Sequence, residues 1–141
     1  MSRPQLWLVV TFACWSSGLA NAEEPQADGD YAGAIAETYK TIGDVELKIY
    51  RFAPENHQPS EQRPAIVFFF GGGWKNGQPT QFVSQCRYLA ERGMVAFTAD
   101  YRVSSRQGTQ AKECVQDGKS AIRWVRTNAA RLGVDPQRIA A

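Results

Sequence analysis

Three consecutive glycines directly after a long apolar run constrain the fold of this chain more than any other feature of its sequence. The run is AIVFFF, residues 65–70, and it is followed by Gly71, Gly72 and Gly73. A short, continuous apolar segment is typical of a strand that is buried on both faces, as in a parallel sheet covered by helices. Glycines at its end leave backbone N–H groups without neighbouring side chains. We therefore expect either a ligand-binding loop or a tight turn there.

The segments around this strand alternate between strand and helix patterns. The alternation of apolar and polar residues predicts a half-buried antiparallel strand over residues 45–52, with residues 39–42 as its hairpin partner. A helix is predicted between residues 79 and 93, because a proline suits its first turn and a glycine its end. The apolar residues 94–99 then predict a second buried strand.

A second helix has the clearest pattern in the chain. Its apolar residues recur at intervals of three and four, which places them on one helix face. They are Val115, Gly118, Ile122, Val125, Ala129 and Leu132. Gly133 is expected to end this helix, Asp135-Pro136 to make a turn, and residues 138–141 to begin one more strand. The order of elements predicts an α/β fold: a mostly parallel sheet, helices on both faces and an antiparallel hairpin at the start.

In sheets of this kind, ligands bind at the carboxyl ends of the parallel strands. Two predicted loops lie there, residues 71–77 and the polar residues 100–110. The sequence therefore predicts that these two loops meet at one edge of the sheet and form the functional site.

The first 22 residues have the three parts of a secretory signal peptide. Arg3 supplies a positive charge, residues 6–13 an apolar core, and Ala20-Asn21-Ala22 a small-residue cleavage site. The core is too short to span a bilayer, and a buried N-terminal helix is the alternative. We expect cleavage after Ala22, export to the periplasm or the medium, and a flexible lead-in over residues 23–37.

Charge and cysteine content exclude several kinds of function. The 16 basic and 14 acidic residues are scattered, so a nucleic-acid or anionic-membrane surface is not indicated. Signal cleavage leaves Cys86 and Cys114, and neither their spacing nor the single histidine, His57, fits a zinc site. We expect no metal and no cofactor.

Three kinds of ligand site compete for the glycine loop. A phosphate-binding P-loop is excluded, because no Gly-Lys-Ser/Thr follows. A dinucleotide site is a poor match: Gly71, Gly73 and Gly77 are wrongly spaced, and Asp100 comes about thirty residues later instead of about twenty. The third kind is an oxyanion hole of the H-G-G-G type. A tight turn without a ligand stays open as an alternative, as does a mere capping role for Trp74.

The glycine loop and the motifs that follow it together resemble the exported esterase/lipase branch of the α/β-hydrolases. The motifs are FFFGGGWKNG, YLAERG, VAFTADYR and SAIRWVRTNAARLGVDPQRIA. The chain is similar to the hormone-sensitive-lipase type and to bacterial feruloyl and acetyl-xylan esterases. The resemblance implies an α/β-hydrolase domain over residues 38–141. It also implies a serine esterase that acts on small-molecule or carbohydrate esters.

Residue by residue, the resemblance assigns the oxyanion-binding N–H groups to Gly71 and Gly72 and the turn of the loop to Gly73. Trp74 would line the substrate pocket. Such donors act because they are already aimed at the position where charge develops, and losing one typically costs about 10²–10³ in rate.

The chain departs from the family pattern just ahead of the glycines. Phe70 stands where the family has a histidine. The backbone donors need no side chain and survive this change, whereas any hydrogen bond through which the histidine holds the loop is lost. Asp100 and Arg102 are expected to fix the neighbouring loop.

The family's nucleophile motif, G-x-S-x-G, is absent. The segment that ends at Ser120 matches only the first half of this motif and lies inside a predicted helix, so Ser120 is expected to be a helix-surface serine. His57 is expected to be a solvated loop residue. We expect the chain to stop before the nucleophile elbow. By itself it should be inactive and poorly stable, with residues 65–70 at an exposed edge. A non-catalytic carbohydrate- or protein-binding module on the same fold is the alternative.

The resembling topology also bears on the two cysteines. It places Cys86 and Cys114 on helices that cover opposite faces of the sheet. A disulfide needs Cα atoms within about 7 Å, so the topology argues against a bridge, whereas an oxidising compartment favours one.

Overall fold

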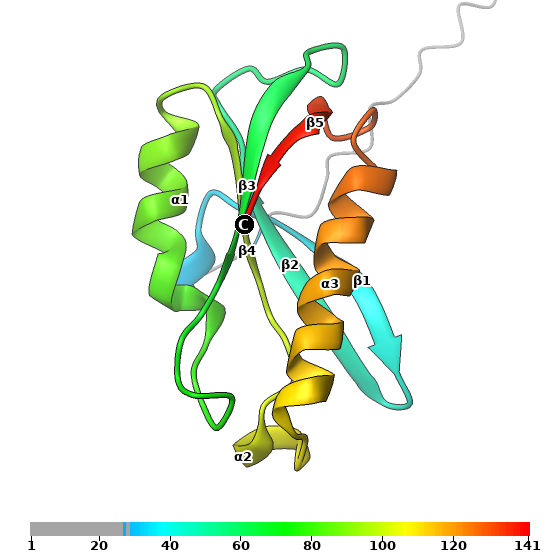
Figure 1. The fold of residues 1–141 in the computed structure, drawn as a ribbon. Coiled ribbons are helices and arrows are strands. Elements are labelled where there is room, and N and C mark those ends of the chain that lie inside the picture. Colours follow the sequence, from blue (N-terminus) through cyan, green and yellow to red (C-terminus); the bar gives the residue numbers. More distant parts are fainter. Residues whose placement is uncertain (1–26, 28) are drawn as a thin grey trace, which may run out of the picture.

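The computed structural model describes residue 27 and residues 29–141. The predicted signal peptide and the cleavage site after Ala22 lie outside these residues. The described chain forms a five-stranded mixed sheet with strand order β1-β2-β4-β3-β5 and helices on both faces (Figure 1). None of the helices in this part of the chain is long and apolar enough to cross a bilayer.

The predicted hairpin is confirmed. β1 (Ile35–Ile42) pairs antiparallel with β2 (Val45–Phe52) across a turn in which Gly43 has a φ of +55°. Leu47 and Ile49 are buried, while Glu46 and Lys48, which alternate with them, are exposed. The alternation in the sequence therefore predicts correctly which face of β2 packs against the core.

Regular structure extends into the predicted lead-in. β1 begins at Ile35, and it is preceded by a 3₁₀ turn, η1 (Gly29–Tyr31). The ring of Tyr31 stacks on that of Tyr50 with centroids 3.8 Å apart, and Ala34 is fully buried. These contacts hold residues 29–34 against the sheet.

β3 (Arg63–Phe69) lies between β4 (Val95–Ala99) and β5 (Val134–Ala140) and runs parallel to both. Every residue of β4 is buried, as its apolar sequence predicts. β2 pairs antiparallel with β4, so the sheet has two antiparallel and two parallel pairings.

β5 covers only the first part of β3. Ala65 pairs with Ile139 and Ile66 with Ala140, whereas residues 135–138 bulge out of register. The predicted Asp135-Pro136 turn lies inside this bulge, where the Asp135 carboxylate accepts the Gln137 N–H at 2.9 Å. The edge that we expected to be exposed along its whole length is therefore paired at its start.

The two main helices cover opposite faces of the sheet, as predicted. η2 (Pro79–Phe82) leads into α1 (Val83–Ala90) on one face, and α3 (Ala111–Thr127) packs on the other (Figure 1). The larger core lies under α3, and its buried aliphatic members include Leu47, Ile49, Val67, Val95, Val125, Leu132 and Val134. A second core lies under α1 and includes Phe52, Val83, Cys86 and Ala96.

Both described cysteines are free thiols in buried positions. Cys86 belongs to the core under α1, and Cys114 packs with Phe70, Tyr101 and Val103 in a third, smaller cluster. The two cysteines thus lie on the two helices that the sheet separates.

Two sequence-based predictions in the C-terminal half are wrong in detail. The polar segment 104–110 contains one helical turn, α2 (Ser104–Gln107), which ends at Gly108 with a φ of +64°. On α3, Val115 is exposed, whereas its neighbour Cys114 and also Asp117 are buried. The reason is that Asp117 forms buried ion pairs, so its position faces the core although its side chain is charged.

Candidate active site

The glycine loop and the loop after β4 meet at one edge of the sheet, as predicted. β3 and β4 are parallel neighbours, with Phe69 opposite Ala99, so both chains leave the sheet at the same end. The loops are joined by backbone hydrogen bonds: the Ser104 N–H donates to Trp74 O at 3.0 Å, and the Ser105 N–H donates to Lys75 O at 2.9 Å. α2 therefore supports the far side of the glycine loop.

Glycine is required at two positions of this loop. Gly72 has a φ of +133°, and a Cβ there would lie 2.0 Å from the carbonyl oxygen of Asn76. Gly77 has a φ of +124°, and a Cβ there would lie 2.4 Å from the ring of Phe70. Gly71 has neither constraint, because its nearest neighbour, the Gln81 side chain, is at 3.8 Å.

Phe70, the residue that departs from the family pattern, is buried beneath the loop. Its ring stacks on that of Tyr101 with centroids 4.0 Å apart, and the Tyr101 hydroxyl donates a hydrogen bond to Phe70 O at 2.5 Å. Burial raises the pKa of Tyr101, so the hydroxyl stays protonated as a donor. Sequence reasoning missed this role of Tyr101, although the aromatic residue directly after Asp100 was a signal.

The backbone donors of the loop differ in what they contact. The Gly71 N–H donates to Gln81 Oε1 at 2.7 Å. The N–H groups of Gly72 and Gly73 donate to no group within residues 29–141. Of the two donors assigned from the resemblance, Gly71 is thus engaged by a side chain and Gly72 is open. Gly73, expected only to shape the turn, also has an open N–H.

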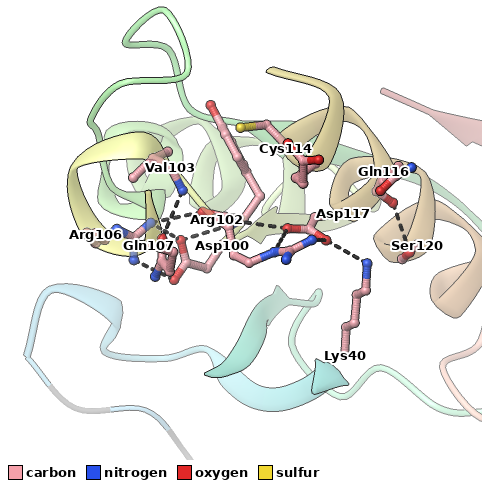
Figure 2. Close-up of polar contacts among 12 residues, drawn as sticks. Lys40, Asp100, Arg102, Val103, Arg106, Gln107, Cys114, Gln116, Asp117 and Ser120 are labelled. Carbon is pink, nitrogen blue, oxygen red and sulfur yellow. Dashed lines mark hydrogen bonds and ion pairs between the residues drawn. The ribbon is translucent and has the colours of Figure 1, made fainter. Parts of the chain in front are cut away.

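Asp100 and Arg102 both fix the loop after β4, as predicted, through different partners. The Asp100 carboxylate accepts the Tyr101 N–H and two hydrogen bonds from Arg106, at 2.6 and 2.9 Å. Arg102 forms a two-pronged ion pair with Asp117 on α3, at 2.7 and 3.0 Å (Figure 2).

Asp117 is the residue on which this network converges. It is fully buried, and Lys40 of β1 donates to it at 2.6 Å from the side opposite Arg102 (Figure 2). Burial acts to raise the pKa of Asp117, but the hydrogen bonds from Arg102 and Lys40 outweigh it and leave the pKa below its usual value. One ionised carboxylate therefore joins β1, the loop after β4 and α3.

An apolar cavity of about 380 Å³ adjoins the glycine loop. It is lined by the aromatic residues Phe70, Trp74 and Tyr101 and, from α3, by Val115 and Ile122. Its volume is in the range of small-ligand sites. In the part of the chain that the structure describes, no three His, Cys, Asp or Glu side chains are grouped as a metal site would need.

Ser120 lies in α3, where its hydroxyl donates to Gln116 O at 2.9 Å. This contact agrees with the predicted helix serine. Its Oγ is bonded within its own helix and is not presented on a strand-to-helix turn.

The prediction for His57 is wrong. Its side chain is only 4% exposed and lies between Glu61, at 2.5 Å from Nδ1, and Leu132 O, at 2.8 Å from Nε2. The ring also packs against Gly133, where a Cβ would come within 2.6 Å of it. His57 therefore fastens a surface loop to the start of β5, at the end of the sheet away from the glycine loop. The sequence alone could not show that the His57 ring packs against Gly133, because the two residues are far apart in the chain.

Comparison with known proteins places this geometry among esterases. The sequence profile of the BD-FAE family matches residues 47–141. The solved structure of Est2, a thermophilic esterase from Thermogutta terrifontis, is 56% identical and superposes with a TM-score of 0.77 over 78% of this chain and 40% of that one. Its propionate-bound form is 55% identical, with a TM-score of 0.77 over 79% and 42% of the two chains.

Curated relatives with lower sequence identity are also named as esterases. Carboxylesterase NlhH of Mycobacterium tuberculosis is 31% identical over 104 residues, which are 72% of this chain and 30% of the relative. Esterase B1 of Culex pipiens is 30% identical over 110 residues, 71% of this chain and 20% of the relative. The chain thus spans less than half the length of the proteins that it matches.

Proposed function

The chain belongs to the BD-FAE family of α/β-hydrolase esterases, and on this premise we propose that the protein hydrolyses carboxylic esters with its glycine loop as the oxyanion-binding element. One observation carries the proposal: the open N–H groups of Gly72 and Gly73 lie at the carboxyl end of β3, beside an apolar cavity. Donors fixed in advance at such a position stabilise the negative charge of a tetrahedral intermediate.

In the proposed reaction, a serine hydroxyl attacks the ester carbonyl, and a histidine takes the serine proton and passes it to the leaving alcohol. Water then releases the acid from the acyl-enzyme. We assign the oxyanion contacts to Gly72 and Gly73, because Gln81 already occupies the Gly71 N–H.

We place the serine, the histidine and the acid in sequence that follows residue 141. Ser120 is bonded within α3, and His57 lies at the opposite end of the sheet. Neither of them lines the cavity beside the glycine loop. The greater length of the matched esterases leaves room for the remaining groups.

The cavity supports a preference for short acyl chains. It is small, apolar and partly walled by Trp74, and the solved Est2 structures include propionate-bound and butyrate-bound forms. We propose esters of short acids as substrates, with a small alcohol or a carbohydrate as the alcohol part.

The test uses the coding sequence expressed to its stop codon. We expect 4-nitrophenyl acetate and butyrate to be hydrolysed and the palmitate ester to be hydrolysed far more slowly. Est2 is known in a form phosphorylated by paraoxon, so paraoxon should release one equivalent of 4-nitrophenolate and abolish turnover. A correctly folded protein that neither hydrolyses these esters nor releases 4-nitrophenolate from paraoxon would contradict the proposal and favour a binding module.

We also propose that the protein is exported after cleavage behind Ala22. The support is the sequence of residues 1–22 alone: a basic start, a short apolar core and an A-x-A site. Mass spectrometry of exported protein should find Glu23 as the first residue. An exported protein that retains Met1 would contradict this.

A further inference from the structure

We propose that Gln81 is a positioning residue for the oxyanion-binding loop. Its side-chain carbonyl holds the Gly71 N–H, and this contact orients the loop so that Gly72 and Gly73 present their N–H groups to the substrate. The expected effect on turnover rests on the esterase function proposed above.

The peptide group between Phe70 and Gly71 is held at both of its polar ends. Its carbonyl oxygen accepts the Tyr101 hydroxyl, and its N–H donates to Gln81 Oε1 at 2.7 Å. A peptide group is planar, so two hydrogen bonds at opposite ends fix the orientation of the plane. Tyr101 is buried, whereas Gln81 is exposed, which makes Gln81 the half of this clamp that can be changed without disturbing the core.

Gln81 stands on a firmly anchored turn. It belongs to η2 (Pro79–Phe82), whose first residue is buried and accepts a hydrogen bond from Thr98 of β4 at 2.8 Å. The ring of Phe82 stacks on that of Phe68 with centroids 5.0 Å apart. The Gln81 side chain therefore reaches the loop from a fixed base, as a positioning group must.

The residues directly after Gly71 depend on this clamp because they have few contacts that would fix their orientation. Gly72 and Gly73 have no side chains and left-handed φ values of +133° and +60°. Between Gly71 and the α2 contacts, the loop has one internal hydrogen bond, from the Lys75 N–H to Gly72 O at 3.1 Å. A rotation of the peptide plane between residues 70 and 71 would therefore also change the orientation of the Gly72 N–H. Displacing a reacting contact by about 1 Å can cost about 100-fold in rate.

The first experiment measures the hydrogen bond itself. Selective ¹⁵N-glycine labelling of the full-length protein allows amide exchange to be followed at the loop glycines. We expect the Gly71 amide to exchange at least about 10-fold more slowly than those of Gly72 and Gly73, since Gly71 alone of the three donates to a group within residues 29–141. Gln81→Met removes the acceptor at similar length and should abolish this difference, whereas Gln81→Glu keeps an acceptor and should preserve it.

The second experiment measures its consequence for turnover. Gln81→Met should lower kcat for 4-nitrophenyl butyrate by about 10-fold to about 100-fold, with KM and the melting temperature unchanged. The matched control is Gln85→Met, because Gln85 is exposed one turn later and its side chain accepts a hydrogen bond from the hydroxyl of the neighbouring Ser84 and makes none to the glycine loop. The control should keep wild-type kcat.

The outcomes separate this inference from the proposed function. Wild-type protein without turnover contradicts the esterase proposal, and the exchange data then still decide whether Gln81 holds the loop. Active protein in which Gln81→Met retains kcat, or loses it no more than Gln85→Met does, overturns the positioning role. So does a Gly71 amide that exchanges as fast as that of Gly72 in the wild type.

Discussion

The hydroxyl of Tyr101 donates a hydrogen bond to the carbonyl oxygen of Phe70 while the rings of the two residues stack, with centroids 4.0 Å apart. Tyr101→Phe keeps the stacked ring and leaves a buried carbonyl without its donor. We expect a loss of about 1–3 kcal/mol in the free energy of unfolding, measured by urea denaturation. Tyr88→Phe, on the exposed face of α1, should change it little. Equal effects of the two variants would contradict the role given to Tyr101.

Adjacent glycines of the loop should respond differently to alanine. Gly71→Ala places its methyl group in ordinary contact with Gln81, whereas Gly72→Ala drives its methyl group into the carbonyl of Asn76 at a strained φ. We expect Gly71→Ala to keep most of the esterase turnover of the full-length protein and Gly72→Ala to lose at least about 100-fold. Ester hydrolysis and thermal unfolding check this. A tolerated Gly72→Ala would show that the loop is not held as described.

Removing the carboxylate of Asp117 should be the most damaging change in its network. Asp117→Ala leaves the Arg102 guanidinium and the Lys40 ammonium without their shared partner. Breaking a buried pair from one side typically costs about 3–5 kcal/mol. Lys40→Met should cost less, because Arg102 still pairs with the carboxylate through two hydrogen bonds. Denaturant unfolding measures both, and a Lys40 variant as unstable as the Asp117 variant would contradict this order.

Stability should depend on Glu61 in acid. Hydrogen bonds from Arg63 first and from His57 second lower the pKa of Glu61 to about 2. A carboxylate whose pKa is lower in the folded state stabilises the fold above its unfolded pKa, and this contribution is lost as the pH falls from about 4.5 towards 2. Glu61→Gln should therefore flatten the fall in melting temperature across this range.

The control for this pH dependence is Glu55→Gln. Glu55 is exposed in the same surface loop and has no hydrogen bond or ion pair with the residues that the structure describes. Its variant should follow the wild-type curve. A Glu61→Gln protein that follows the same curve would rule out the linkage.

The thiol of Cys86 should be inert in the folded protein. Burial raises its pKa to about 12, so the reactive thiolate is essentially absent at pH 8. We expect Cys86 to react with a thiol reagent only after unfolding. A Cys114→Ser variant allows this to be measured without a contribution from the Cys114 thiol. Peptide mapping of the denatured, unreduced protein should find Cys86 and Cys114 each as a free thiol, as they are in the structure. Finding their two peptides joined would show that Cys86 and Cys114 form a disulfide.

Sequence patterns were sufficient for the elements whose burial follows a simple period. The alternation around Leu47 and Ile49 predicted the hairpin, and the apolar runs predicted β3 and β4. The glycine loop was located for the same reason, because it interrupts a buried strand. A further strand from residue 138 was also predicted, and β5 includes residues 138–140.

The errors arose where a polar group was buried by a distant partner. Asp117 is buried because Lys40 and Arg102 reach it, and His57 because Glu61 and the carbonyl oxygen of Leu132 lie within hydrogen-bond distance of its two ring nitrogens. Hydrophobic periodicity counts a buried charged residue as surface, so it predicted that Val115, and not Asp117, faces the core. The polar composition of the loop around His57 likewise predicted a solvated side chain. The contact between Gln81 and the Gly71 N–H could not be predicted from sequence either, since it exists only in the folded loop.

Lys40 and Asp117 are 77 residues apart in the chain. At typical rates of synthesis, the ribosome adds those residues in about 4–15 s. Until Asp117 has been added, the Lys40 ammonium group has no carboxylate to meet, and until residues 95–99 have been added, β2 lacks its neighbour β4. Leu47 and Ile49 can therefore be covered only once the second half of the domain, including α3, is present. A chaperone that binds incomplete chains would find these two side chains exposed.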